Sequence, residues 1–289
     1  MEEVRALVLS GGGSKGSYQA GVVDYLLRVL GRRYAIHAGV SVGAINSVWL
    51  AHFRDGEEQE AACGLVQFWQ GISTDKVRKR WFFGDLSVLW KPSRYNSEPL
   101  RKYLAARLDP ERVRKSRKRL FVGAVSLDSG RFEAFTEQAG SMLLDAVLAS
   151  ASYPAMLLPI KLAGELWTDG GVRDVTPLAT AIDAGATVVD VVMCTPRDKR
   201  YSELRDPNAL DVLERAVSIM TDEVIETDIA LARAYNQIAK HEPNGKRRHV
   251  EINVIRPSEG LGVSSLNFDP EDMARLLEQG RADAQEQAH

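Results

Sequence analysis

Ser41 stands in a pattern that suits a nucleophile. Residues 39–43 read Gly-Val-Ser-Val-Gly, a GxSxG pattern, where an apolar run ends and a helical pattern starts. A sharp turn between a strand and a helix would lift the Ser41 hydroxyl out of a sheet, and Gly39 and Gly43 would leave room for the bend. The N-terminal dipole of the following helix would stabilise negative charge at the hydroxyl. The pattern therefore predicts nucleophilic attack by Ser41.

A glycine-rich loop lies ahead of this pattern. Residues 11–16 read Gly-Gly-Gly-Ser-Lys-Gly and fit GxGxxG between a strand and a helix. A dinucleotide site would also need an acidic residue at the end of the second strand, but residues 36–39 read Ile-His-Ala-Gly. A Walker A loop is excluded because Lys15 precedes glycine. Two interpretations remain. Either the backbone amides of the loop and the N-terminus of the following helix bind an anion or a transient oxyanion, or the loop is a simple tight turn.

Asp169 is the candidate base. Residues 167–171 read Trp-Thr-Asp-Gly-Gly, and Asp-Gly is also a common turn dipeptide. A carboxylate becomes a useful base when it contacts the nucleophile directly in a partly desolvated pocket. The segment is therefore either a plain turn or the base for Ser41.

The histidines offer no clear alternative base. His37 falls in the strand expected before Ser41, His52 in the helix after it, and His289 is the last residue. His241 and His249 flank the polar loop at residues 242–248, without a recognisable partner motif. A Ser-His-Asp esterase stays open as a hypothesis, and so does a lipid-binding protein without catalysis.

Together the three segments resemble the patatin-like phospholipase family. The pattern of this family is a GxGxxG loop, then GxSxG, then a distant Asp-Gly-Ala/Gly, and all three occur here in that order. Lys15 fills the basic position of the loop, and residues 149–154 resemble the Ala-Ser-x-x-x-Pro stretch that precedes the aspartate. The resemblance covers residues 4–194, and the C-terminal third is less diagnostic.

The resemblance implies a three-layer α/β/α sandwich and a Ser–Asp dyad without histidine. Ser41 would attack an acyl ester of a lipid, of the phospholipase A or lysophospholipase type, and form an acyl-enzyme. Asp169 would act as base, and no cofactor or metal is implied. The implied oxyanion hole consists of the amides of Gly11, Gly12 and Gly13. The residues implied to support the motifs are Lys15, Gly16, Gly39, Gly43, Gly170 and Gly171.

The chain departs from many members of the family after Gly171. Residues 172–177 read Val-Arg-Asp-Val-Thr-Pro, where many relatives carry small or amide side chains. Arg173 and Asp174 are therefore expected to alter the preference for the lipid head group.

The pattern of the whole chain predicts the elements that must position these residues. Strands are expected at residues 4–9, 34–40, 187–194 and 250–255, and a hairpin at 119–136 that turns at 128–130. Helices are expected at 16–30, 43–53 and 141–150, one long helix or two at 206–241, and a capped helix that starts at Asp269. This alternation favours one α/β domain, residues 1–289, on a mostly parallel sheet, with the C-terminal third completing it.

Composition narrows the class of protein. Of 289 residues, 45% are hydrophobic and 26% are charged, as in a soluble globular protein, and 37 basic against 39 acidic residues disfavour binding to nucleic acid. Two distant cysteines, no visible signal peptide and no long apolar stretch indicate a cytoplasmic protein. The segment from Lys76 to Phe83 mixes cations with aromatic residues, and it either touches a membrane surface or is a loop packed on the core.

Overall fold

The computed structural model describes residues 3–82, 84, 90–197, 207, 209–241 and 249–288. In this part of the chain, eight strands form one sheet in the order β10-β9-β1-β2-β5-β8-β7, and β6 pairs with β5. The strands of the sheet are β1 (Arg5–Leu9), β2 (Ile36–Val40), β5 (Arg119–Ser126), β6 (Phe132–Thr136), β7 (Ile160–Leu162), β8 (Glu165–Asp169), β9 (Val188–Val192) and β10 (Glu251–Ile255). A separate two-stranded ribbon pairs β3 (Lys79–Arg80) with β4 (Tyr95–Asn96).

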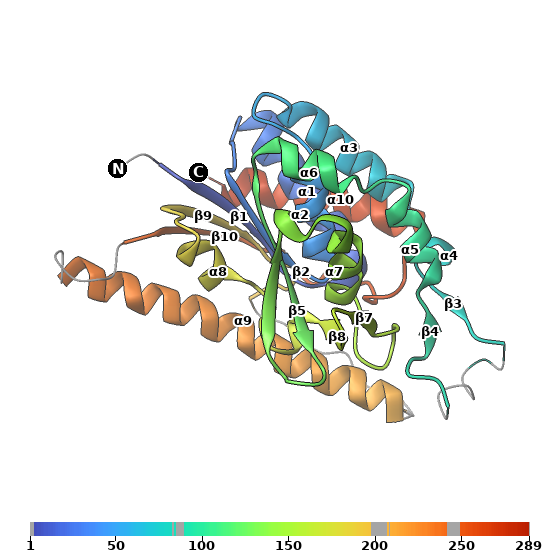
Figure 1. The fold of residues 1–289 in the computed structure, drawn as a ribbon. Helices are drawn as coiled ribbons and strands as arrows, with labels where there is room; N and C mark the ends of the chain where they lie inside the picture. Colours follow the sequence, from blue (N-terminus) through green and yellow to red (C-terminus); the bar gives the residue numbers. More distant parts are fainter. Residues whose placement is uncertain are drawn as a thin grey trace.

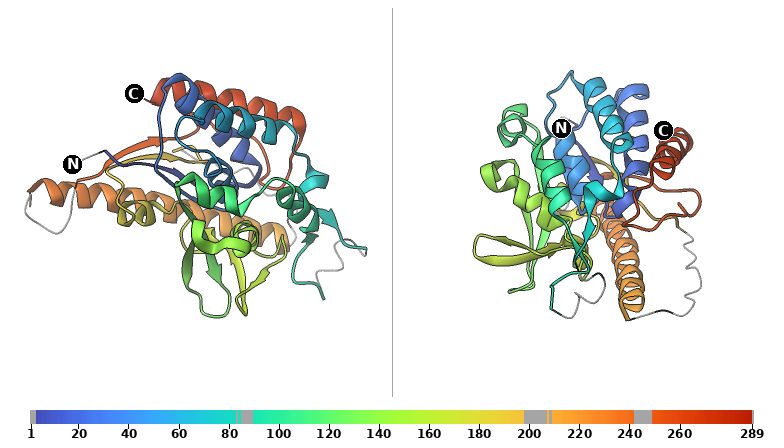
Figure 2. Two further views of the ribbon diagram at one scale, coloured as in Figure 1. Left: turned by 45° about the horizontal axis from the view of Figure 1, so that its top comes forward. Right: turned by 90° about the vertical axis from the view of Figure 1, so that its right-hand side faces the viewer.

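Helices cover both faces of the sheet, as Figures 1 and 2 show. The helices are α1 (Gly16–Asp24), α2 (Val42–Leu50), α3 (Glu58–Gln70), α4 (Thr74–Val77), α5 (Glu98–Ala105), α6 (Pro110–Ser116), α7 (Leu143–Ser150), α8 (Leu178–Asp183), α9 (Ala209–His241) and α10 (Pro270–Gln287). A π-helix (Tyr25–Val29) extends α1, and short 3-10 turns are η1 (Gly13–Lys15), η4 (Glu137–Met142) and η5 (Gly170–Val172).

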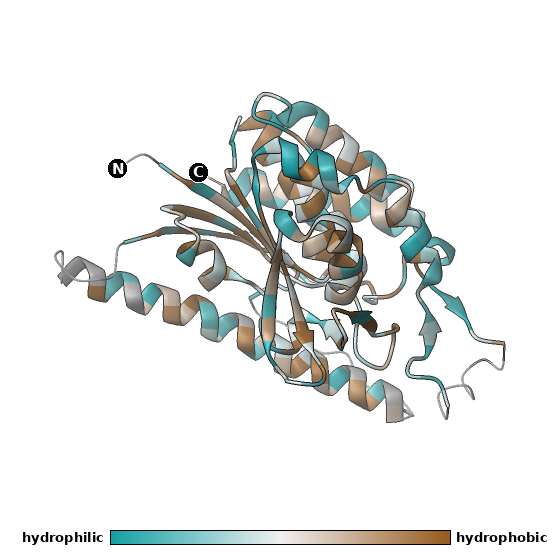
Figure 3. Cartoon of the chain, viewed as in Figure 1, coloured by the Kyte–Doolittle hydropathy of each residue, from teal (hydrophilic) through white to brown (hydrophobic). Residues whose placement is uncertain are grey.

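Strand alternation creates two separate cores. In β1, Leu7 and Leu9 face the larger core beneath α1, α2, α3, α7 and α10, while Ala6 and Val8 face the smaller core beneath α8 and α9. Successive side chains of a strand point to opposite faces, so a strand covered on both sides is apolar throughout. Figure 3 shows this as brown along the central strands. The expected α/β/α sandwich is confirmed.

The expected elements lie close to the observed ones. β1, β2, β9 and β10 form parallel pairs, and β5 and β6 form the expected antiparallel hairpin. The helical pattern at 206–241, left open as one helix or two, is the single helix α9. At α10, Asp269 Oδ1 accepts the amides of Glu271 and Asp272, which is the expected cap. No described helix is long and apolar enough to cross a membrane.

Candidate active site

The site forms where two strands meet end to end on the same edge of β5. β2 runs parallel to β5 and ends with Val40 opposite Gly123. β8 runs antiparallel to β5 and ends with Asp169 opposite Ala124, the next residue. Both strands must share one edge of β5, because β6 pairs with the other edge over the same residues. Ser41, directly after Val40, is thereby brought beside Asp169, although the two are far apart in the sequence.

The backbone at Ser41 is strained and held from the side. Ser41 has φ 57° and ψ −125°, a conformation that a side chain rarely adopts and that surrounding contacts must enforce. Its amide donates to Ser150 Oγ at 2.9 Å, and this hydroxyl donates to the Gly123 carbonyl at 2.6 Å. A Cβ on Gly39 would lie 2.2 Å from the Gly43 carbonyl oxygen, so the elbow closes only with glycine there.

A short stretch of chain holds both Ser41 and Asp169. Ser150 ends α7 and contacts the backbone of Ser41, as described above. Two residues later, the carbonyl of Ser152 accepts the Asp169 amide at 3.1 Å and the Thr168 hydroxyl at 2.8 Å. The stretch at 149–154, noted in the sequence only for its resemblance, thus fixes the relative position of the two side chains.

The Asp169 carboxyl is buried, and its pKa is raised. Its side chain is buried, and Oδ1 accepts the Gly171 amide at 2.8 Å. Oδ2 is buried and has no hydrogen-bond partner within the described ranges. Burial raises the pKa of Asp169 to about 6, while the Ser41 hydroxyl and the Gly171 amide limit the rise. A carboxylate with such a pKa is ionised at neutral pH and is a stronger base than an exposed aspartate.

The glycine loop offers two amides rather than three. The Gly11 amide donates to the Val175 carbonyl at 3.0 Å, so it could take part in an oxyanion hole, as expected from the sequence, only if this bond were broken. The amides of Gly12 and Gly13 meet no acceptor among the described residues. Gly13 has φ +61°, and a Cβ there would lie 2.0 Å from the Ser265 carbonyl oxygen. The loop between β1 and α1 therefore requires glycine at position 13.

The other residues of the three motifs support this geometry. A Cβ on Gly43 would lie 2.1 Å from the Leu9 carbonyl oxygen, and one on Gly170 would lie 2.4 Å from the Gly123 carbonyl oxygen. Gly16 starts α1, where its carbonyl accepts the Asn46 side chain. Lys15 lines the same cavity as Ser41, and its carbonyl faces the buried Cys194 thiol, whose pKa is raised by burial to about 11. That thiol is therefore protonated and unreactive at neutral pH.

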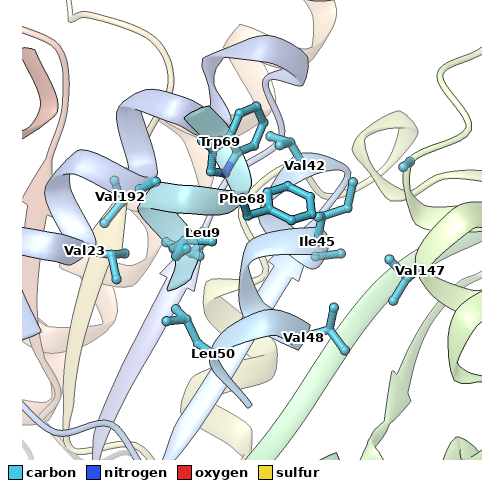
Figure 4. Packing of buried hydrophobic residues seen from close by; sticks show 14 of the residues in the cluster. Leu9, Val23, Val42, Ile45, Val48, Leu50, Phe68, Trp69, Val147 and Val192 are labelled. Carbon is cyan, nitrogen blue, oxygen red and sulfur yellow. The ribbon is translucent and has the colours of Figure 1, made fainter. Parts of the chain in front are cut away.

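One cavity joins the reactive groups to the apolar core. It has a volume of about 150 Å³. Ser41, Asp169, Gly12 and Gly13 line one end. The other end is apolar and is lined by Ile45, Phe68, Trp69, Ile72, Val77, Leu100, Leu266 and Phe268. Figure 4 shows Val42 and Ile45 of α2 close to Phe68 and Trp69 of α3. Helix α9 adds Val217, Ser218 and Thr221 to the wall.

The histidines with described side chains lie away from this cavity. His37 is buried inside β2, and burial lowers its pKa to about 3. His52 Nδ1 contacts the Val48 carbonyl at 2.8 Å, and its Nε2 accepts the Asp109 amide at 2.9 Å. None of His37, His52 and His249 lines the cavity. The side chain of His241 and residue His289 lie outside the described part.

The two charged residues that depart from the family pattern after Gly171 also form their contacts outside the cavity. Arg173 donates to the Gly130 carbonyl at 2.8 Å, and Asp174 accepts the Thr176 amide at 3.0 Å. Neither residue lines the cavity, whereas Val172 and Val175 do. The expected influence of Arg173 and Asp174 on the head group therefore has no direct contact to carry it.

The sequence as a whole decides the family. The family model described as patatin-like phospholipase matches residues 7–182. The chain belongs to the patatin-like phospholipase family. The matched region contains the glycine loop, Ser41 and Asp169, and ends within α8.

The chain is also similar to individual proteins. The patatin-like chain is 26% identical over 283 residues to the uncharacterized protein YjjU of Escherichia coli strain K12, covering 90% of this chain and 71% of that protein. It is also 26% identical over 195 residues to a cGAMP-activated phospholipase of Escherichia coli strain TW11681, covering 58% of this chain and 52% of that one. The crystal structure of VipD from Legionella pneumophila shares the fold, with a TM-score of 0.50 at 16% identity over 99% of this chain and 66% of VipD.

A buried polar chain behind the patatin-like site has no signature in the sequence. Trp69 Nε1 donates to Asn46 Oδ1 at 2.8 Å, and the Asn46 amide donates to Gln19 Oε1 at 3.0 Å. Gln19 in turn donates to the Ser10 carbonyl at 2.8 Å. These contacts tie α2 and α3 to the end of β1, and so hold the glycine loop and the Ser41 elbow at a fixed spacing. The polar residues Gln19 and Asn46, placed inside α1 and α2, form no motif by which the sequence alone would show these contacts.

Proposed function

We propose that the protein is a serine acyl hydrolase that cleaves fatty-acyl esters of lipids, in the manner of a phospholipase A or lysophospholipase. The observation that carries this proposal is the meeting of β2 and β8 on β5, which brings Ser41 and Asp169 into one cavity. The apolar end of that cavity suits an acyl chain, and the family membership supports a lipid ester as substrate.

In the first half-reaction, Ser41 Oγ attacks the ester carbonyl while Asp169 Oδ2 takes the hydroxyl proton. The tetrahedral oxyanion faces the amides of Gly12 and Gly13, each worth about 3 kcal/mol in comparable sites. The carbon–oxygen bond to the alcohol then breaks, and Asp169 returns the proton to the leaving alcohol. In the second half-reaction, Asp169 deprotonates a water that attacks the acyl-enzyme, and the proton returns to Ser41 as the fatty acid leaves.

The decisive experiment compares Ser41→Ala and Asp169→Asn with the wild type. We expect both variants to lose release of fatty acid from phospholipid and lysophospholipid vesicles, and Ser41→Ala to lose labelling by a fluorophosphonate probe. Ser47→Ala and Asp174→Asn are matched controls, because Ser47 is buried, Asp174 is half-buried and neither lines the cavity. Full activity in either site variant contradicts the dyad. Folded wild type that neither reacts with the probe nor releases acid would favour a lipid-binding protein instead.

A large loss of activity in a histidine variant would instead favour a Ser-His-Asp esterase. His241 and His249 are the residues to replace first, because His37 and His52 are buried and do not line the cavity. We expect His241→Ala and His249→Ala to keep the kcat of the wild type.

We also propose that residues 1–289 form one domain that acts in the cytoplasm and touches membranes from the surface. β10 extends the sheet beside β9, and α10 packs on α1 through a bond from the Ser17 hydroxyl to the Met273 carbonyl at 2.6 Å. Both support a single domain. Cys63 and Cys194 are free thiols, as suits a reducing compartment.

The membrane contact is proposed for the described part of the segment that starts at Lys76. Val77 is buried, but Lys79 and Arg80 are exposed and the Phe82 side chain is 95% exposed. Phe83 lies outside the described residues. Cations beside an exposed ring suit an anionic lipid surface. We expect Phe82→Ala to weaken sedimentation with phosphatidylglycerol vesicles. Leu127→Ala, at the exposed turn after β5, is the control; equal binding by both variants contradicts this contact.

A further inference from the structure

A second cavity opens at the carboxyl ends of β9 and β10, away from Ser41. It is lined by Pro196, Arg197, Arg233, Val254, Arg256, Pro257, Ser258, Glu259, Gly260 and Gln287. Three of these side chains are guanidinium groups and one is a carboxylate. In parallel sheets, ligands bind in the crevice outside the carboxyl ends of the strands. We call this cavity the arginine pocket.

Arg256 is the buried cation of the arginine pocket. Its side chain is 12% exposed, and Nη1 pairs with Glu226 at 2.7 Å. Its Nη2 donates to the Met193 sulfur at 2.8 Å, and a thioether is a weak acceptor. Gln287 fixes the backbone, since it accepts the Arg256 amide at 3.1 Å and donates to its carbonyl at 2.9 Å. Arg256 is therefore a rigidly placed guanidinium that still has donors for a stronger acceptor.

Arg197 and Arg233 bring two more cations to the same cavity from different elements. Arg197 follows β9, and Arg233 lies on α9. Within the described ranges neither forms an ion pair. Glu226 is already paired with Arg256. Glu259 is the one carboxylate among the lining residues against three arginines, so the pocket keeps a net positive charge. Planar guanidinium groups that converge on a cavity match the oxygens of a phosphate group.

The arginine pocket and the catalytic cavity share two walls. The segment after β9 gives Thr195 to the catalytic cavity and Arg197 to the arginine pocket. Helix α9 gives Thr221 to the first cavity and Arg233 to the second. These two residues are twelve positions apart on one helix, about 18 Å at 1.5 Å per residue. Figure 1 shows α9 as one long helix along the side of the sheet, with its N-terminal end toward β8.

Helix α9 is held much more firmly at its C-terminal half than at its N-terminal half. Ile229 and Ala232 are buried, and Asn236 exchanges two hydrogen bonds with the backbone of Val250, at 2.6 and 3.0 Å. The N-terminal half has no buried side chain among the described ones. Large apolar side chains are exposed along the whole helix, namely Val212, Leu213, Ile219, Met220, Leu231 and Ile238. A ligand in the arginine pocket would therefore bind beside the C-terminal half of α9, which has buried side chains and hydrogen bonds to Val250. The N-terminal half of the same helix forms a wall of the catalytic cavity.

We propose that the arginine pocket binds a phosphate-bearing anion, and that this anion controls the catalytic cavity through α9. The phosphate bridges Arg197 and Arg256 of the sheet edge to Arg233 of α9. This bridge adds a tie between α9 and the sheet, and it steadies the wall formed by Val217, Ser218 and Thr221. A steadier wall favours binding of long acyl chains, which reach that wall, over short ones. The effect on activity rests on the proposed hydrolase function, but the binding site does not.

Binding is tested on the full chain by calorimetry with inorganic pyrophosphate. We expect Arg233→Gln and Arg256→Gln to weaken binding about tenfold each, the loss of one charge-assisted contact. Arg233 is exposed, so its variant keeps the fold even if Arg256→Gln does not. Arg215→Gln, on the same helix but outside the arginine pocket, is the matched control and should bind as the wild type does. Absence of binding by the wild type, or equal binding by Arg233→Gln, overturns the proposal.

Two further arms identify the source of the phosphate and the coupling. ATP in solution is compared with vesicles of phosphatidylcholine with and without phosphatidic acid, and dependence on Arg233 marks the true source. Hydrogen exchange should slow in residues 217–221 when pyrophosphate is bound, in the wild type but not in Arg233→Gln. Pyrophosphate should also lower KM for a decanoyl ester and leave KM for an acetyl ester unchanged. Binding without slower exchange at 217–221 refutes the coupling through α9.

Discussion

Replacing Ser150 by alanine tests how the strained elbow at Ser41 is maintained. The Ser150 side chain is fully buried, and its hydroxyl accepts the Ser41 amide at 2.9 Å and donates to the Gly123 carbonyl at 2.6 Å. The alanine variant removes both bonds, so the Ser41 amide and the Gly123 carbonyl each lose one hydrogen-bond partner. It changes no atom that would touch the substrate, so Ser150 acts as a positioning residue.

The loss of these two hydrogen bonds sets the expected change in stability and in kcat. A buried polar group without a partner costs about 1–3 kcal/mol, so the free energy of unfolding should fall by at least about 1 kcal/mol. The conformation of Ser41 itself costs about 1–3 kcal/mol and persists only while its surroundings enforce it. Once the elbow relaxes, Ser41 Oγ moves away from Asp169, and a misplacement of this kind lowers kcat by about tenfold to a hundredfold.

The assay separates kcat from KM on a chromogenic acyl ester, together with urea unfolding. We expect kcat to fall and KM to stay within about threefold, because the apolar wall of the cavity is unchanged. Ser47→Ala is the control, since Ser47 is equally buried but its hydroxyl has no partner among the described residues. It should keep both activity and stability. If Ser150→Ala keeps the kcat of the wild type, or if Ser47→Ala loses as much, the elbow does not depend on Ser150.

Four other outcomes follow from the structure. The kcat/KM of the wild type should rise with pH with an apparent pKa of about 6, because Asp169 must be ionised to accept the proton. The same raised pKa means that the contribution of Asp169 to stability declines as pH rises from about 4 to about 6; urea unfolding should show a decline that is absent in Asp169→Asn. Gly13→Ala should abolish activity, because its Cβ would clash with Ser265. Gly31→Ala is the control: Gly31 has φ +62° and nothing within 4 Å of its Cβ position, so this variant should lose only stability. Labelling of both variants with the fluorophosphonate probe checks this. His52→Ala should lower the free energy of unfolding by about 1–3 kcal/mol and leave kcat/KM nearly unchanged, because both ring nitrogens of His52 form hydrogen bonds with the backbone. A loss of activity in folded His52→Ala would argue for a histidine base.

Local patterns sufficed to predict the elements around the site. β1, the glycine loop and α1 follow from an apolar run, glycines and a helical period within residues 4–30, and the elbow follows from residues 39–43. Each of these signals acts over a few neighbouring residues, so one sequence displays it.

The contacts that join distant segments were beyond prediction. Nothing near Ser150 in the sequence shows that its hydroxyl reaches Ser41, 109 positions away. The hydrogen bond from the Gly11 amide to the Val175 carbonyl depends on how the chain after Asp169 passes the glycine loop. The place of α9 beside the cavity is equally non-local, because its own pattern shows a helix but not the surface on which it lies.

The shared edge of β5 has a consequence for how such enzymes diversify. Val40, which precedes Ser41, and Asp169 are paired with neighbouring residues of one strand, Gly123 and Ala124, so the separation of the proposed nucleophile and base is fixed by the strand repeat and not by the loops. The long excursion between α2 and β5 can therefore lengthen, shorten or be exchanged without moving the reactive pair. Phe68, Ile72, Val77 and Leu100, which line the apolar end of the cavity, all belong to that excursion. Evolution, or a protein engineer, can remodel the choice of acyl chain there while leaving the chemistry intact.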